Sequence, residues 1–326
     1  MTRQTVKRWG IFFFLLAIAL TFWFAPLVRA EDSQDIFMPL VPNDPSLTPT
    51  LTPTPTLTPT RTATPSTPPK QNWLAYVNWF RGLAGVPAVN DDAILNNNCW
   101  EHARYMGENL HLTHVQDPAK PYASAAGQVC AQNGNVWLGW GTGWQSYQPI
   151  DGWMGSTGHR LWLLYPTTPT FGFGFYQSAN TTKGAGGALD VLSRANFNAD
   201  EAYTGWPIRY PASNQVNVPP SRYPITLFWR YFGPAPTVTS TNLVTSGGVS
   251  LSHSVTTSLA AAHKGVELIP TSNLPTGTRI TVTINGTYNG APFNATWSFT
   301  TAASADAQEF APALVEPPVE APKEVP

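Results

Sequence analysis

Residues 91–114 and 152–166 decide the fold of this chain. The first stretch reads D-D-A-I-L-N-N-N-C-W-E-H-A-R-Y-M-G-E-N-L-H-L-T-H, and the second reads G-W-M-G-S-T-G-H-R-L-W-L-L-Y-P. The acidic pair is typical of a helix N-terminus, and apolar residues follow it at the spacing of one helix face. That face consists of Leu95, Cys99, His102, Met106 and Leu110. We therefore expect an amphipathic helix that opens at the acidic pair and ends in Thr113 and His114.

The segments around this helix predict an α+β domain. A preceding helix is indicated by Trp73, Val77, Phe80 and Ala84, and it would end at Gly85. The run F-G-F-G-F-Y from Phe171 alternates as a strand does, so its aromatic residues share one face and its glycines allow close packing on the other. Further elements are expected as a strand at 127–131, helices at 149–154 and 157–164, and a strand at 188–195 that completes a hairpin. Helices that flank a small antiparallel sheet form a layered sandwich.

Three separated motifs occur here in the order expected for a known family. They are N-W-F-R-G-L-A-G-V-P from Asn78, the helix that leads to L-T-H, and D-G-W-M-G-S-T-G-H-R from Asp151. With these motifs, residues 72–196 resemble the CAP superfamily of cysteine-rich secretory proteins, antigen 5 and plant pathogenesis-related proteins, in its shorter bacterial form. The resemblance implies an α-β-α sandwich with a cleft of two histidines and two glutamates, which bind a divalent metal in some members.

The cleft positions implied by the resemblance carry two histidines but no glutamate. His114 in L-T-H and His159 in G-H-R match the two histidines. Gln128 stands where relatives carry the glutamate of a Gly-Glu-Asn strand, and Ser156 stands where they carry the second one. Glutamine cannot ionise or act as a general base, and serine removes the carboxylate altogether. We therefore expect these four residues to line a ligand-binding cleft without a catalytic residue.

A metal site is the alternative at the same residues. The imidazoles of His114 and His159 can each bind zinc, but structural zinc takes four protein ligands and catalytic zinc takes three. Asp117 and Asp151 are the candidates for a further ligand, although nothing in the sequence places them beside the histidines. The expectation is therefore no cofactor, with a divalent metal such as zinc on the histidine pair as the less favoured alternative.

Two polar residues of this region have plain structural interpretations. His102 lies on the apolar helix face, which predicts a hydrogen-bonded core histidine rather than a ligand. Ser156 precedes His159 at the spacing of a helix cap, so capping explains it without a nucleophile.

Tryptophan is dense between residues 137 and 162. Trp153 and Trp162 are expected in the core. The loop N-V-W-L-G-W-G-T-G-W carries Trp137, Trp140 and Trp144, and it is the candidate for an exposed aromatic patch that stacks on apolar groups or sugars.

The C-terminal half predicts a second, all-β domain. Short strand-like runs at 237–244, 248–257, 265–269, 278–285 and 295–300 are separated by turn residues, which is typical of a small sandwich. L-P-T-G-T from Leu274 and W-S-F-T-T from Trp297 resemble bacterial Ig-like modules of surface proteins. We expect the CAP-like domain at 70–200, a bridging segment at 201–235 and an Ig-like β-sandwich at 236–302.

The two ends of the chain have the composition of exported proteins. Basic residues, an apolar run and Val28-Arg29-Ala30 predict a signal peptide at 1–30, with an uncleaved membrane anchor as the alternative. Residues 31–69 are rich in Thr and Pro and predict a disordered stalk, and residues 303–326 predict a disordered tail. No further membrane span is expected after cleavage, so the chain should be secreted or held at the cell surface.

Charge and cysteine content narrow the function further. The formal net charge is −1, and no basic cluster of the kind that binds nucleic acid is present. Cys99 and Cys130 are the only two cysteines, so an exported chain allows one disulfide, with two buried thiols as the alternative. The favoured hypothesis is a non-enzymatic extracellular protein that binds a lipid, a glycan or a cell-surface protein. A metal-dependent hydrolase that uses His114 and His159 and an inert surface spacer are the alternatives.

Overall fold

The computed structural model describes residues 67–304 and 318–320. The expected signal peptide, most of the expected stalk and most of the expected tail lie outside these residues. Within the described residues, no helix is both long enough and apolar enough to cross a membrane.

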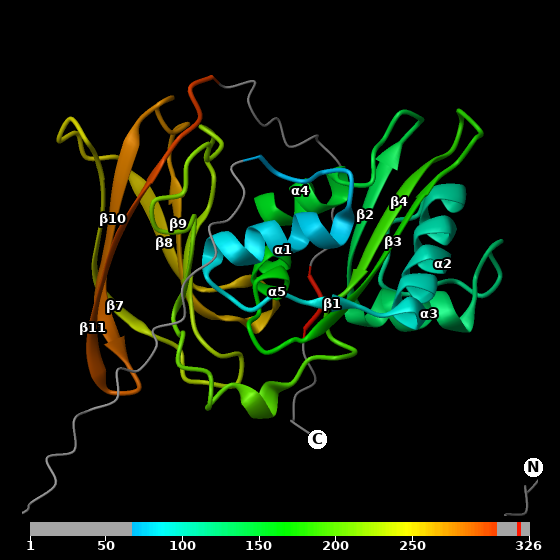
Figure 1. Cartoon of the computed structure of the whole chain (residues 1–326), viewed down its shortest axis with the longest axis horizontal. Helices are drawn as coiled ribbons and strands as arrows, with labels where there is room; N and C mark the ends of the chain where they lie inside the picture. The colour runs from blue at the N-terminus through cyan, green and yellow to red at the C-terminus, as the bar shows by residue number, and fades with distance from the viewer. Residues whose placement is uncertain (1–66, 305–317, 321–326) are drawn as a thin grey trace, which may run out of the picture. The chain divides into compact units, whose positions relative to one another are not determined.

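A mixed sheet between two layers of helices forms the N-terminal region (Figure 1). Its strands follow the order β1-β3-β4-β2, in which β1 is parallel to β3 and the other pairs are antiparallel. Helices α2 and α3 lie on one side of the sheet, and α1, α4 and α5 lie on the other. The helices are α1 (Trp73–Ala84), α2 (Ala93–Asn109), α3 (Ala125–Asn133), α4 (Gln148–Gly155) and α5 (Thr157–Leu163), and the strands are β1 (Asn90–Asp91), β2 (Gly134–Trp140), β3 (Thr170–Gln177) and β4 (Gly184–Asp190). This arrangement confirms an α+β fold.

The alternation of Phe and Gly in β3 determines which helices cover each face. A Cβ atom at Gly174 would lie 2.1 Å from the backbone N of Trp100, so only glycine lets α2 approach this closely. On the opposite face, the Phe173 ring packs against Trp73 of α1 at 5.4 Å and Trp153 of α4 at 6.4 Å between centroids. The predicted two-faced strand is confirmed.

The predicted starts of α1 and α2 are confirmed by their caps. Asn72 accepts a hydrogen bond from the N–H of Ala75, and Asp92 accepts from the N–H groups of Ile94 and Leu95. Helix α2 ends at Asn109, earlier than expected, because Leu110 takes a left-handed conformation with φ 48°. The residues from Leu110 to His114 therefore leave the helix and belong to the loop that follows it.

The strand expected at 127–131 is wrong, because this segment is helix α3. Ser124 caps it by accepting a hydrogen bond from the N–H of Gly127. Its buried residues, Gly127, Cys130 and Ala131, recur at the i, i+3, i+4 spacing of a helix rather than with the period of a strand. Cys130 forms a disulfide with Cys99 of α2, with 5.1 Å between their Cα atoms, and this bond ties α3 to α2.

The second strand of the hairpin begins earlier than expected. The turn closes at Lys183, whose N–H donates to the carbonyl of Asn180 at 3.0 Å. Strand β4 therefore starts at Gly184 and ends at Asp190 rather than covering residues 188–195.

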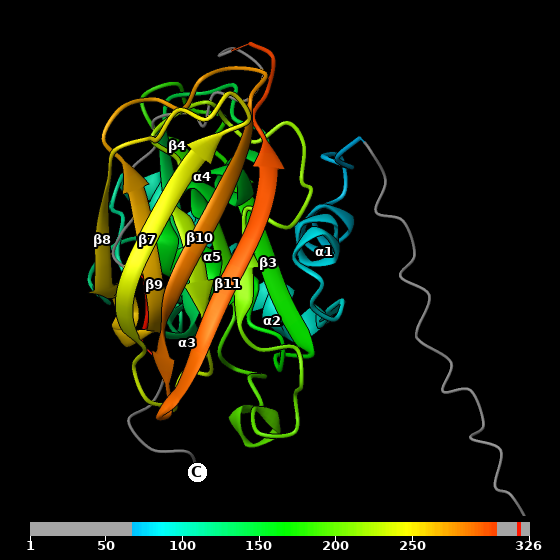
Figure 2. The ribbon, with the colours of Figure 1, turned by 90° about the vertical axis from the view of Figure 1, so that its left-hand side faces the viewer.

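The C-terminal region is all-β, as expected, and consists of two sheets. One has the order β11-β10-β7 and the other β5-β6-β9-β8. Figure 2 shows the three-stranded sheet facing the viewer. The strands are β5 (Ile208–Tyr210), β6 (Ile225–Phe228), β7 (Thr237–Thr245), β8 (His253–Ser258), β9 (Lys264–Pro270), β10 (Arg279–Tyr288) and β11 (Ala291–Thr300), with short 3-10 turns η1 (Phe197–Ala199) and η2 (Ala260–Ala262). Residues 201–235, for which we expected a bridging segment, contribute β5 and β6 to the second sheet.

Helix α5 joins the two regions through buried contacts. The Arg160 guanidinium donates to the carbonyl of Pro224 at 2.7 Å and lies over the ring of Tyr223 at 4.6 Å. The Trp162 ring packs against Tyr231 at 5.1 Å and against His263 at 4.2 Å between centroids. One hydrophobic core therefore runs from the helices into the β-sheets.

Candidate functional site

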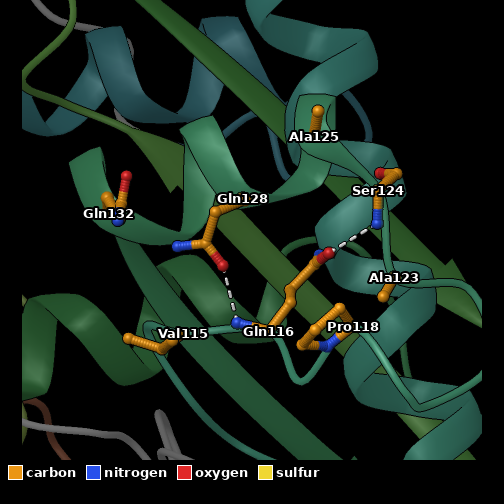
Figure 3. A pocket seen from close by; sticks show the side chains of 8 residues that line it. All are labelled: Val115, Gln116, Pro118, Ala123, Ser124, Ala125, Gln128 and Gln132. Carbon is orange, nitrogen blue, oxygen red and sulfur yellow. Dashed lines mark hydrogen bonds between the residues drawn. The ribbon is translucent and has the colours of Figure 1, made fainter.

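A pocket of about 420 Å³ lies at the start of α3, beside the loop that follows α2 (Figure 3). Its lining carries no ionisable side chain. Amide and hydroxyl groups alternate with small apolar groups, and the lining consists of Val115, Gln116, Pro118, Ala123, Ser124, Ala125, Gln128 and Gln132. Such a lining offers hydrogen bonds and apolar contact but no charge.

Gln116 organises the wall of this pocket. Its side-chain oxygen accepts a hydrogen bond from the N–H of Ser124 at 2.7 Å, and its side-chain nitrogen donates to Nδ1 of His102 at 3.0 Å. Its backbone N–H donates to Oε1 of Gln128 at 2.6 Å. Because Gln116 is buried, these bonds fix the loop against α2 and α3. Sequence reasoning missed Gln116, since it belongs to no motif and its partners are distant in the chain.

His102 is the core histidine that the sequence predicts. The ring is buried, Nδ1 accepts from Gln116, and Nε2 donates to the carbonyl of Thr113 at 2.9 Å. Burial lowers its pKa to about 4, because the charged form would lose its hydration. The neutral imidazole therefore acts as a structural link between α2 and the loop.

Gln128 holds the same loop from α3. Its Oε1 accepts from the backbone N–H of Gln116, and its Nε2 donates to the carbonyl of His114 at 3.3 Å. A carboxylate at this position would accept the first bond but has no hydrogen for the second. The amide therefore suits a latch between helix and loop, a task that an ionised glutamate could not perform.

His114 is fixed by its own ring as well as by its backbone. Its Nδ1 lies 2.8 Å from the carbonyl oxygen of Ala131, and because a carbonyl only accepts, Nδ1 carries the proton. The ring is therefore anchored to the C-terminal turn of α3.

His159 and Ser156 form a second pair, on α5. His159 is buried with 2% of its surface exposed, and its Nδ1 lies 2.9 Å from Oγ of Ser156. Ser156 occupies the N-cap position of α5 but makes no side-chain hydrogen bond to the backbone there. The capping interpretation is therefore right in position and wrong in bonding, because the imidazole of His159 takes the hydroxyl group instead.

Both histidines are attached to the junction between α3 and β2. The ring of His114 bonds to Ala131, and the carbonyl of His159 accepts from Nδ2 of Asn135 at 3.1 Å. Of the four cleft residues expected from the sequence, Gln128 lines the pocket in Figure 3, whereas His114, His159 and Ser156 lie outside its lining.

The donor set for a metal ion is small. Among the residues that the structure describes, no group of three or more His, Cys, Asp or Glu side chains is placed to hold one. Asp151, a candidate third ligand, is instead buried beside Tyr76 and 3.1 Å from Nζ of Lys70. Two imidazoles alone would be fewer than the three or four protein ligands that zinc usually takes.

The tryptophans do not form one exposed patch. Trp137 lies in β2 with 1% of its surface exposed, and its ring packs edge-on against Trp144 at 5.1 Å. Trp140 is 63% exposed. Of these three residues, Trp137 therefore belongs to the core, and Trp140 alone is prominent on the surface. Trp153 and Trp162 are buried, as expected.

Comparison with known proteins identifies the N-terminal region. Residues 74–216 match the family model described as CAP, the cysteine-rich secretory protein family. No curated protein matches this chain. The matched residues include α1 to α5, the sheet β1-β3-β4-β2 and the pocket of Figure 3.

Proposed function

Residues 74–216 form a CAP domain, and from this premise we propose that the protein is a non-catalytic recognition protein outside the cell, whose CAP domain binds an uncharged glycan in the pocket at the start of α3. The absence of any ionisable side chain from the lining of this pocket is the observation that carries the proposal.

The chemistry of the lining supports a sugar-like ligand. Glutamine amides and a serine hydroxyl supply both donors and acceptors, and Val115, Pro118, Ala123 and Ala125 supply apolar contact. A neutral sugar presents hydroxyl groups around an apolar ring face and so matches both. The volume of about 420 Å³ lies within the range of ligand pockets. Because the network around Gln116 already fixes the wall, binding would require little ordering.

The placement of the two histidines favours recognition over hydrolysis, because neither belongs to the lining of the pocket. Nδ1 of His114 is committed to Ala131, and Nδ1 of His159 faces Ser156 in a buried position. A hydrolytic mechanism needs an activated nucleophile or a metal-bound water beside the substrate. The uncharged lining of the pocket supplies neither.

Placement outside the cell is the second part of the proposal. The disulfide between Cys99 and Cys130 fits an oxidising compartment. The signal-like residues 1–30 and the Thr/Pro-rich segment at 31–69 suit export and display of the CAP domain on a stalk. The C-terminal sheets would then serve as an Ig-like module behind it.

A glycan array tests the ligand class, with lipid vesicles as a parallel arm. The best neutral glycan is titrated against the chain from residue 31 and against Ala125→Phe, which fills the pocket from its lining. We expect at least a ten-fold loss of affinity in this variant. Val129→Phe is the matched control, because Val129 is exposed on the same helix but does not line the pocket, and it should bind like the unaltered chain.

Three outcomes would overturn the proposal. They are binding of charged glycans only, binding of lipid without glycan, and equal affinity in the two phenylalanine variants. Zinc-dependent cleavage of the bound glycan would establish the hydrolase alternative instead.

A further inference from the structure

Residues 318–320, near the end of the chain, return to pack on α5. The indole N–H of Trp162 donates to the carbonyl of Val319 at 2.6 Å, and Val319 is buried with 8% of its surface exposed. We name this short segment the strap; residues 301–317 separate it in the sequence from the last strand. A hydrogen bond from an indole N–H to a backbone carbonyl is a specific contact.

The position beneath the strap must be a glycine. A Cβ atom on Gly158 would lie 2.2 Å from Cγ of Pro318 and 2.9 Å from Cβ of Ala260 in η2. The missing side chain therefore leaves the space that the proline ring occupies between α5 and η2.

Trp162, which donates to the strap, packs within a cluster of aromatic side chains. The Trp162 ring contacts His263 at 4.2 Å and Tyr231 at 5.1 Å between centroids, and both partners are buried. Trp162 is itself fully buried with the strap in place. The indole that donates to the strap is therefore held in place by residues of the C-terminal region.

These features match the way that proteins bind extended proline-containing peptides. Proline fixes φ and so lowers the entropy lost on binding, and aromatic grooves receive such segments. We propose that the groove between α5 and η2, formed by Gly158, Trp162 and Ala260, is a binding site for extended Pro-Val peptides. In this structure the groove is filled by Pro318 and Val319 of the same chain. The site is independent of the pocket proposed to bind glycans.

A consequence follows from the covalent attachment of the strap. A tethered segment acts at a high effective concentration, so it should exclude the same peptide added from outside. Removal or disruption of the strap should open the groove to such a peptide.

The test uses a fluorescent peptide of residues 312–326 and measures its anisotropy with two proteins. The first is the full chain, and the second ends at residue 317. The shortened chain should bind the peptide saturably, and the full chain should bind it at least ten-fold more weakly. Trp162→Phe in the shortened chain keeps an aromatic ring but removes the N–H, and it should weaken binding about five-fold, as expected for one hydrogen bond.

Two altered peptides supply the matched control. Val319→Asp places a charge on the buried residue and should abolish binding. Val325→Asp makes the same change outside the strap and should bind like the original peptide. Equal binding of the two altered peptides would overturn the proposal, as would no binding to a shortened chain whose circular dichroism matches that of the full chain.

A second variant covers the case in which the shortened chain does not fold. The full chain with Val319→Asp keeps its length but should release its own strap. Its thermal midpoint should fall and should rise again when the unaltered peptide is added. The full chain with Val325→Asp should keep the thermal midpoint of the unaltered chain, with or without the peptide. A midpoint that falls but does not respond to the peptide would contradict an exchangeable groove.

Discussion

Replacing Gln128 by Glu tests why an amide rather than a carboxylate stands at this position. The substitution keeps the acceptor for the N–H of Gln116, 2.6 Å away in the unaltered protein. It removes the hydrogen that Nε2 donates to the carbonyl of His114 at 3.3 Å and brings an anionic oxygen to that carbonyl instead. A typical hydrogen bond contributes about 0.5–1.5 kcal/mol to stability, and repulsion between the carboxylate and the carbonyl oxygen adds to the loss.

The size of this effect should depend on pH, with a defined sign. An unfolded glutamate titrates near pH 4.3, and contact with the carbonyl should raise its pKa in the folded variant. Below pH 4 the protonated acid can donate to His114, so the loss should be small. The loss should begin as pH rises above about 4.3, grow until pH passes the raised pKa of the folded variant, and be complete at pH 7.5.

The assay is chemical unfolding of the chain from residue 31 and of the variant at pH 4 and pH 7.5. The measured quantity is the difference in unfolding free energy between the two proteins at each pH. Gln132→Glu is the control, because Gln132 is exposed on the same helix, and it should change stability by less than about 0.5 kcal/mol. A Gln128→Glu variant as stable as the unaltered chain at pH 7.5, or a difference in unfolding free energy between the two proteins that is larger at pH 4 than at pH 7.5, would refute the latch.

Three further predictions concern stability. Burial lowers the pKa of His263 to about 3 from an unfolded value near 6.5, so stability is retained above pH 6.5 and is lost as pH falls toward 3. His263→Phe should remove about 2 kcal/mol of this loss at pH 5, as measured by urea unfolding across pH. The disulfide closes a separation of 31 residues, so Cys99→Ser with Cys130→Ser should cost about 3–4 kcal/mol, and an unchanged thermal midpoint would contradict this estimate. Trp137→Ala should cost about 3–5 kcal/mol and Trp140→Ala less than about 0.5 kcal/mol, because the Trp137 ring is buried and the Trp140 ring is exposed. Similar losses of stability in the two variants, measured by calorimetry, would contradict this difference in burial.

Local signals in the sequence were sufficient for the elements with strong periodicity. The spacing of apolar residues predicted α1 and α2, and the Phe–Gly alternation predicted both faces of β3. In each case a single physical period, 3.6 or 2, determines which side chains face the core. The Asp92 cap and the Gly85 stop were readable for the same reason, because each acts within its own turn.

The misplaced elements are those for which local pattern was weak. The strand expected at 127–131 rests on a Gly-Gln match to a strand motif, although Gly127, Cys130 and Ala131 have helical spacing. Strands β5 and β6 are only three and four residues long and lie among prolines, so they gave no alternation to detect. Their place in a sheet depends on pairing with distant β9.

The candidate site shows the same difference between residues with a local sequence signal and residues whose role depends on tertiary contacts. His102 could be assigned to the core from its place on α2, but the role of Gln116 depends on three partners from separate segments. The sequence likewise allowed a disulfide without showing that Cys99 and Cys130 are close. Side chains whose role arises from tertiary contact carry no signature in their own neighbourhood.

The most direct test of the central claim is calorimetric titration of the best neutral glycan into the chain, in excess EDTA and again with added zinc. A neutral recognition pocket predicts one dissociation constant under both conditions, an intact glycan after the titration, and at least ten-fold weaker binding to Ala125→Phe. Binding that requires zinc, or a glycan recovered in cleaved form, would contradict it.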